Sequence, residues 1–149
     1  MGVATHKADE GLVVLACGSR DWTACGVVEA TISALHFQRG IARLVHGACR
    51  GADRMAGEVA KQLGIVVQPY PAEWRDASGR LDRSAGPRRN RQMFVEGKPN
   101  LVIAFHDQLA GSRGTRDMVE VARATVDVWV VRSDGTKQVY PAGSGSIFS

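Results

Sequence analysis

Five short apolar runs, each separated from the next by a helical pattern, limit the folds open to this chain of 149 residues. The runs are short and nearly all apolar, as strands covered on both faces require. Strands that alternate with helices predict an α/β protein, with a mostly parallel sheet of about five or more strands and helices on both faces. The expected strands are residues 12–17, 41–45, 65–67, 100–105 and 127–131, and the expected helices are residues 23–37, 52–63, 87–96 and 115–125.

The length and composition predict one globular domain. Hydrophobic residues make up 44% of the chain and charged residues 23%, which is ordinary for a protein with a packed core. We expect a flexible N-terminus over residues 1–10, the folded domain over 11–132, and a Gly/Ser-rich tail over 133–149. A short hairpin around Asp134-Gly135 is expected to open this tail, which is then disordered. No apolar run approaches the ~20 residues of a membrane span, and the first residues lack a signal-peptide pattern, so we expect a cytoplasmic protein with no membrane contact.

The cysteines and histidines do not predict a metal site or a bound cofactor. Cys17, Cys25 and Cys49 are odd in number and lack CxxC spacing, which argues against both a disulfide framework and zinc. The four histidines show no paired ligand spacing. We therefore expect reduced thiols, no metal and no cofactor.

Three turns after expected strands share the same chemistry. CGSRDW (17–22), HGACRGAD (46–53) and AGSRGTRD (110–117) each combine glycine with arginine. The carboxyl ends of parallel strands lie along one edge of a sheet, where the first turns of the following helices can offer N–H groups to phosphate or carboxylate. A glycine after a strand is often a plain connection, but three such turns on one edge predict an anion site. The candidate ligand-binding residues in these turns are Gly18, Ser19, Arg20, Gly47, Gly51, Asp53, Gly111, Ser112, Arg113, Gly114 and Thr115.

Two of these predictions are more specific. Residues 111–115 are expected to form a phosphate-binding turn, in which the glycines let the backbone approach the anion and Thr115 donates its hydroxyl. For Asp53, a cap of the following helix and an acceptor for a ribose hydroxyl are equally well supported. None of the turns has the GxGxxG or Walker pattern, which disfavours a standard dinucleotide fold and a P-loop NTPase.

Successive segments of the chain also resemble a known family. GSRDW, HGACRGADRMA, PAEW, AGPRRNRQM and AFHDQLAGSRGTRDMV, spread over residues 12–131, are similar to the motifs of the YspA/YpsA-type families of the SLOG superfamily. This superfamily joins the DNA-processing protein DprA/Smf with the LOG nucleotide phosphoribohydrolases. The resemblance implies a Rossmann-like fold and a pocket for a nucleotide or nucleotide-derived ligand, such as an NAD or ADP-ribose derivative. It also implies a homodimer, and it adds Arg89 and Asn90, which match the family's RN pair, to the ligand-binding residues.

The chain departs from the LOG enzymes where their catalysis resides. Their PGGxGTxxE motif ends in a glutamate needed to cleave the base–ribose bond, and Met118 stands at that position here, one residue after Asp117. Asp117 and Glu120 are the candidate catalytic residues, with Asp53 as the third available carboxylate. The sequence leaves open whether the protein is an enzyme. If it is, we expect an N-glycosidic hydrolase acting on a nucleotide.

The segment before the third expected helix has two interpretations. Residues 75–91 hold six arginines, which form either a solvated loop or a lid whose Arg88, Arg89 and Asn90 close over phosphates. Trp74 is expected to anchor this segment rather than to stack on a base.

Three hypotheses of function follow from these features. The leading hypothesis is a protein that binds a nucleotide-derived small molecule as a sensor or a sequestering agent, and the second is a LOG-type nucleoside monophosphate phosphoribohydrolase. The third is a DprA-like binder of single-stranded nucleic acid, suggested by the sequence pI of about 9.3. It is the weakest, because aromatic residues, the usual stacking platforms, are only 6% of the chain.

Overall fold

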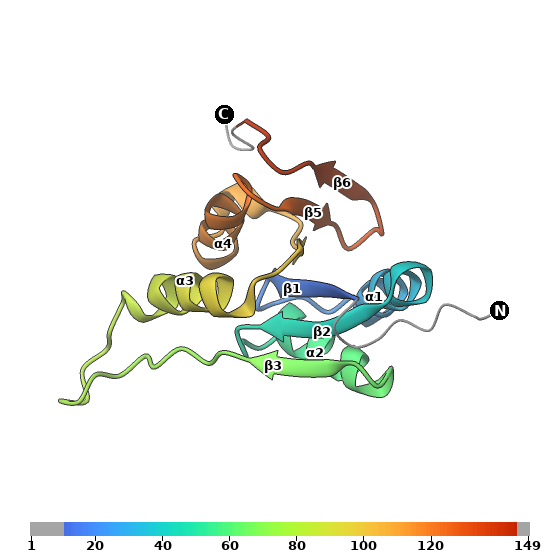
Figure 1. Cartoon of the computed structure of the whole chain (residues 1–149). Helices are drawn as coiled ribbons and strands as arrows, with labels where there is room; N and C mark the ends of the chain where they lie inside the picture. The colour runs from blue at the N-terminus through green and yellow to red at the C-terminus, as the bar shows by residue number, and fades with distance from the viewer. Residues whose placement is uncertain (1–10, 146–149) are drawn as a thin grey trace.

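A computed structural model describes residues 11–145, so the expectations for residues 1–10 and 146–149 lie outside the described residues. Six strands form one sheet in the order β3-β2-β1-β4-β5-β6, with helices packed against it (Figure 1). The predicted fold class, α/β with a mostly parallel sheet and helices on both faces, is confirmed. The strands are β1 (Leu12–Gly18), β2 (Ile41–His46), β3 (Val66–Pro69), β4 (Leu101–Phe105), β5 (Asp127–Val131) and β6 (Lys137–Tyr140). The helices are α1 (Cys25–Arg39), α2 (Ala52–Gln62), α3 (Ala85–Gly97), the 3-10 turn η1 (Leu109–Gly111) and α4 (Gly114–Ala122).

The strand order creates one switch point. The chain runs from β1 outward to β2 and β3, and then returns to the other side of β1 to form β4 and β5, all in parallel pairing. Neighbouring strands β1 and β4 therefore send their connections in opposite directions, and a crevice opens beyond their carboxyl ends. β6 extends the sheet by one antiparallel strand, after a turn in which Gly135 has a φ of 87°.

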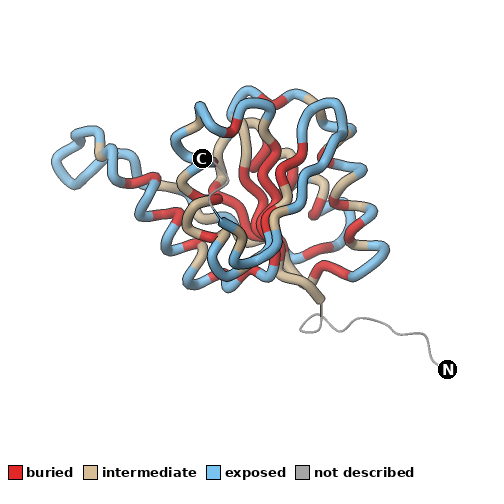
Figure 2. Tube along the Cα trace, turned by 90° about the horizontal axis from the view of Figure 1, so that it is seen from above, coloured by how far each residue is buried: buried red, intermediate tan, exposed pale blue. Residues whose placement is uncertain are grey.

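The helices form two layers, one on each face of the sheet. Residues of α1 and α2, including Val28, Ile32 and the small side chains Ala56 and Ala60, pack on one face. Met93 of α3 packs on the other face, together with the buried residues of α4. The buried positions accordingly run through the central strands and the inner faces of the helices, with exposed residues outside (Figure 2). Covering both faces explains why the strands are almost entirely apolar.

Residues 70–84, here called the arm, link β3 to α3 and project away from the sheet (Figure 1). A single antiparallel bridge between Arg75 and Leu81 closes its far end. α3 begins at Ala85, two residues before Pro87, the residue near which the sequence predicted its start. Within residues 11–145, no helix has the length and apolar character needed to cross a membrane.

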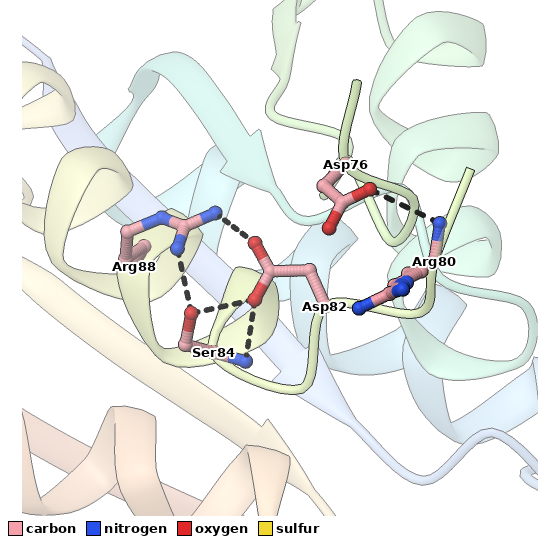
Figure 3. A network of polar contacts seen from close by, with 5 residues as sticks. All are labelled: Asp76, Arg80, Asp82, Ser84 and Arg88. Atoms are coloured by element: carbon pink, nitrogen blue, oxygen red, sulfur yellow. Dashed lines mark hydrogen bonds and ion pairs between the residues drawn. The ribbon is translucent and has the colours of Figure 1, made fainter. Parts of the chain in front are cut away.

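The base of the arm is held by a polar network around Asp82 (Figure 3). Its carboxylate accepts hydrogen bonds from the Ser84 backbone N–H at 3.0 Å, from the Ser84 hydroxyl at 2.6 Å and from the Arg88 guanidinium at 2.6 Å. The Ser84 and Arg88 hydrogen bonds lower the pKa of Asp82 to about 2. This network joins the end of the arm to the first turns of α3.

Candidate functional site

A cavity of about 560 Å³ lies at the switch point, beyond the carboxyl ends of β1 and β4. Its wall combines the ends of these strands, the β2–α2 turn, the β4–α4 turn, the arm and the inner face of α3. This is the position at which open α/β sheets bind their ligands. The predicted binding residues that line it are Gly18, Ser19, Arg20, Asp53, Arg89, Asn90, Ser112, Arg113, Gly114 and Thr115. The structure thus brings residues of all three predicted turns, and of the expected RN pair, to one cavity.

Three of the predicted binding glycines do not line this cavity. Gly47 and Gly51 lie in the β2–α2 turn, and Gly111 ends η1 and faces a neighbouring cavity. Gly47 is explained by packing, because an added Cβ would stand 2.6 Å from the Arg89 guanidinium. Gly51 is explained by its backbone, since its φ is 81° and an added Cβ would lie 2.4 Å from the Ser19 carbonyl oxygen.

Gly18 lines the cavity but is also required by the fold. A Cβ there would lie 2.3 Å from the Phe105 carbonyl oxygen and 2.7 Å from the Ala52 side chain. Glycine at this position lets β1, β4 and the start of α2 approach one another at the cavity floor.

Gly114, like Gly111, is not explained by packing or by a left-handed backbone, in contrast to Gly18, Gly47 and Gly51. It is the first residue of α4, its φ is outside the left-handed region, and an added Cβ would meet no atom within 4 Å. Next to it, the Ser112 hydroxyl accepts a hydrogen bond from the Thr115 backbone N–H at 3.2 Å. The α4 N-terminus is therefore ordered by Ser112, with open space beside Gly114 at the cavity wall.

Arg89 is buried and acts as a cross-link between segments. Its guanidinium donates hydrogen bonds to the Gly47 carbonyl, to the Tyr70 carbonyl at 3.2 Å and to the Asn90 side-chain oxygen at 3.1 Å, and lies 3.8 Å from the Cys49 sulfur. These contacts tie α3 to the β2–α2 turn and to the start of the arm. Arg88, by contrast, is bound to Asp82 at the base of the arm and does not line the cavity.

Asp53 lies in the first turn of α2 and does not cap this helix, which has no side-chain cap hydrogen bond; its carboxylate instead holds the preceding β2–α2 turn. Its carboxylate accepts hydrogen bonds from the backbone N–H groups of Gly47 at 2.9 Å and Cys49 at 3.5 Å. Burial raises the pKa of Asp53 to about 6, although the nearby Arg89 guanidinium and the two backbone hydrogen bonds oppose the rise. Because Asp53 also lines the cavity, the ribose-acceptor interpretation remains a proposal.

The two candidate catalytic carboxylates are in different surroundings. Asp117 lines the cavity, and the buried Asn90 donates a hydrogen bond to its carboxylate at 2.9 Å. Asn90 also donates to the Gly114 carbonyl at 3.2 Å, so it fixes the start of α4 relative to α3. Glu120 lies outside the cavity lining and pairs with Arg123 at 2.8 Å.

Sequence reasoning missed several residues that line the cavity. Trp74, weighed as an anchor, packs its ring over Gly86, where an added Cβ would be 3.0 Å away, and lies 5.4 Å from the Arg20 guanidinium. Trp74 therefore anchors the arm and also forms part of the wall. Leu81 and Met93, which had no sequence signal of their own, also line the cavity, together with Arg83 and Met118.

His106 is the missed residue that the sequence could have revealed, since it directly follows β4 at the switch point. Its Nδ1 accepts a hydrogen bond from the Gln108 backbone N–H at 3.0 Å. Burial lowers the pKa of His106, against the opposing effect of Asp107, so the ring is neutral near pH 7. A neutral imidazole with an accepting Nδ1 carries its proton on Nε2 and can donate it to a ligand.

Comparison with known proteins finds a family match over part of the chain. The family model of the YspA, cpYpsA-related SLOG family matches residues 12–76. Over these residues the chain is similar to this SLOG family. The match spans β1 to β3 and the start of the arm, so it includes the first two predicted turns, while the β4–α4 turn lies beyond it. Similarity to the SLOG family is consistent with nucleotide-related binding. No curated protein and no solved structure matches the chain significantly.

In residues 11–145, no group of three or more His, Cys, Asp or Glu side chains is placed to hold a metal ion. All three cysteines are free thiols; Cys17 is buried, and burial raises its pKa.

Proposed function

We propose that this protein binds a nucleotide or a nucleotide-derived small molecule, NAD-like or ADP-ribose-like, in the switch-point cavity, as a sensor or sequestering protein. The observation that carries this proposal is the glycine at the start of α4. Close packing or backbone conformation explains why Gly18, Gly47 and Gly51 are glycines. Gly114, in contrast, lies beside open space and its φ is outside the left-handed region. A close approach of a ligand to the backbone gives this glycine a reason to be present.

The chemistry of the cavity wall supports an anion at this end. Arg20 and Arg113 supply guanidinium groups, and Ser19, Ser112 and Thr115 supply hydroxyls. The N-terminus of α4 adds the positive end of a helix dipole. Each charge-assisted hydrogen bond contributes roughly 1.5–3 kcal/mol, so a few converging contacts reach the about 8 kcal/mol of micromolar affinity.

Other residues of the cavity wall suit a flat apolar group. The Trp74 ring, Leu81, Met93 and Met118 line the cavity, and Trp74 and Leu81 are 37% and 56% exposed. An aromatic base could cover these exposed side chains and gain both apolar burial and ring contacts. A nucleotide combines such a base with a phosphate, and it therefore matches both kinds of lining residue.

The first test is mass spectrometry of small molecules released from freshly purified protein, followed by calorimetric titration with AMP, NAD and ADP-ribose. We expect a nucleotide-derived molecule in the released fraction and micromolar binding of at least one of the three compounds. Absence of both would contradict the proposal.

A second candidate function, hydrolysis of an N-glycosidic bond, is favoured by the placement of Asp117. Its carboxylate is in the cavity wall and is oriented by Asn90, one residue from the position of the LOG glutamate. At that position Met118 supplies no carboxylate. The wild type and Asp117→Asn should be incubated with AMP, NAD and ADP-ribose and assayed for free base and ribose phosphate. Release by the wild type but not by Asp117→Asn supports an enzyme, and unchanged ligand with both proteins supports a binding protein.

A further inference from the structure

Two of the three cysteine thiols line the switch-point cavity, and they differ in exposure. Cys49, in the β2–α2 turn, is half-buried, whereas Cys17, near the end of β1, is only 6% exposed. Within residues 11–145 the Cys17 thiol has no hydrogen-bond partner, so the cavity wall contains a buried polar group that the protein leaves unpaired. The third thiol, Cys25, is exposed at the start of α1 and lies outside this cavity.

The wall around these thiols carries more positive than negative charge. Its volume of about 560 Å³ is in the range of sites for small molecules. A small anion is therefore attracted into the cavity and toward Cys49, and a small cation is repelled. The charged side chains of the lining are the four arginines Arg20, Arg83, Arg89 and Arg113 and the two carboxylates Asp53 and Asp117.

The Arg89 guanidinium lies directly beside the Cys49 sulfur, at 3.8 Å. When a thiolate attacks a disulfide, negative charge is shared among the reacting sulfur atoms, and a guanidinium at this position stabilises that charge. Cys17 does not compete for the same reaction. Burial raises the pKa of Cys17, which keeps it protonated near pH 7, and a protonated thiol is not a nucleophile.

We propose that Cys49 is a modification site for small anionic disulfides, which the arginines of the cavity attract to its sulfur. The Cys49 thiolate attacks one sulfur of the disulfide, and a new S–S bond forms as the S–S bond of the disulfide breaks. The other half leaves with the electron pair as a thiolate and takes a proton from water. Cys49 is thereby oxidised to a mixed disulfide, and the released half is reduced to a thiol. This inference does not depend on the proposed function, because it needs only the thiol and the charges of the cavity.

The experiment treats the full chain with three small disulfides: glutathione disulfide, which is anionic, bis(2-hydroxyethyl) disulfide, which is neutral, and cystamine, which is cationic. Peptide mass spectrometry follows modification of Cys49 and of Cys25 in the same sample, and the ratio of the two rates cancels the intrinsic reactivity of each reagent. We expect this Cys49-to-Cys25 ratio to be about tenfold higher with glutathione disulfide than with the neutral disulfide, and lowest with cystamine. High salt should reduce the difference.

Arginine variants test the origin of this preference. Arg113→Gln and Arg20→Gln each remove one cation from the cavity lining, and each should reduce the preference for the anionic over the neutral disulfide by about threefold. Arg39→Gln is the matched control, because it makes the same change of charge at an exposed position at the end of α1, outside the described cavities. It should leave the preference unchanged. Urea denaturation establishes that the variants are folded.

Several results would overturn the proposal. It fails if Cys49 stays unmodified while Cys25 reacts, or if Cys17 is modified before Cys49. It also fails if the Cys49-to-Cys25 ratio differs by less than about threefold between the anionic and the neutral disulfide. If folded Arg113→Gln and Arg20→Gln both keep the full preference of the wild type, the arginines do not select the anion and the proposal is wrong. The proposed function stands or falls separately, on the binding of nucleotides.

Discussion

Replacing Gly114 by valine separates a ligand-binding turn from a plain connection. The new side chain would enter space that is empty in the described protein, at the first residue of α4 and at the wall of the cavity. The backbone φ is not in the left-handed region, so no backbone strain is expected. Any loss of binding by this variant then reports on the ligand rather than on the fold.

The expected magnitudes for stability and binding differ clearly. Replacing a glycine whose backbone conformation suits other residues stabilises the folded protein by about 0.4–1 kcal/mol, because the unfolded chain loses conformational freedom. The low helix propensity of valine offsets part of this stabilisation. We therefore expect the free energy of unfolding to change by less than about 1 kcal/mol. A ligand kept away from the α4 backbone loses one or more charge-assisted hydrogen bonds, each about 1.5–3 kcal/mol, which corresponds to about a ten- to hundredfold weaker Kd per bond.

The assay is urea denaturation of the wild type and the variant, followed by calorimetry with whichever nucleotide binds the wild type. Gly26→Val is a matched control, because Gly26 lies in the first turn of α1, also has no atom within 4 Å of an added Cβ, and lines no described cavity. It should leave binding unchanged. If folded Gly114→Val binds as tightly as Gly26→Val, the β4–α4 turn is only a connection and the reasoning fails.

Three other predictions concern the wall and the assembly. Burial raises the pKa of Asp53 from 3.8 to about 6, so its contribution to stability is present below pH 4 and is lost as pH rises through 6. In urea denaturation, the stability of the wild type relative to Asp53→Asn should fall by about 2–3 kcal/mol from pH 4 to pH 7, and a constant difference would refute this. Arg89→Met removes a buried cation that links α3 to two other segments and should lower the free energy of unfolding by about 3–5 kcal/mol, whereas a loss below about 1 kcal/mol would contradict the cross-linking role. The homodimer implied by the LOG resemblance should appear in light scattering at micromolar concentration, and a monomer mass would exclude it.

The sequence by itself determined the sheet and the edge on which the cavity opens. Short apolar runs can be buried on both faces only as strands of a doubly covered sheet, and their alternation with helices makes the pairing parallel. The end of the second helix was also predictable: the expected helix 52–63 stops before Gly64, whose φ of 77° cannot continue a right-handed helix. Once the strands are parallel, the turns that hold Ser19, Asp53 and Ser112 must lie along one edge.

Only the tertiary structure decided which residues complete the site and which of the glycines serve the fold. Arg89 reaches the Gly47 carbonyl across 42 positions in the chain, and no local pattern encodes a contact of that separation. Trp74 and Leu81 become part of the wall because the arm returns to α3, where the Asp82 network fixes its base. The sequence around Gly47 and Gly114 does not show which of the two has room for a side chain, because the atoms that could fill that room come from distant segments. Packing fills the space beside Gly47 with the Arg89 side chain and leaves the space beside Gly114 open.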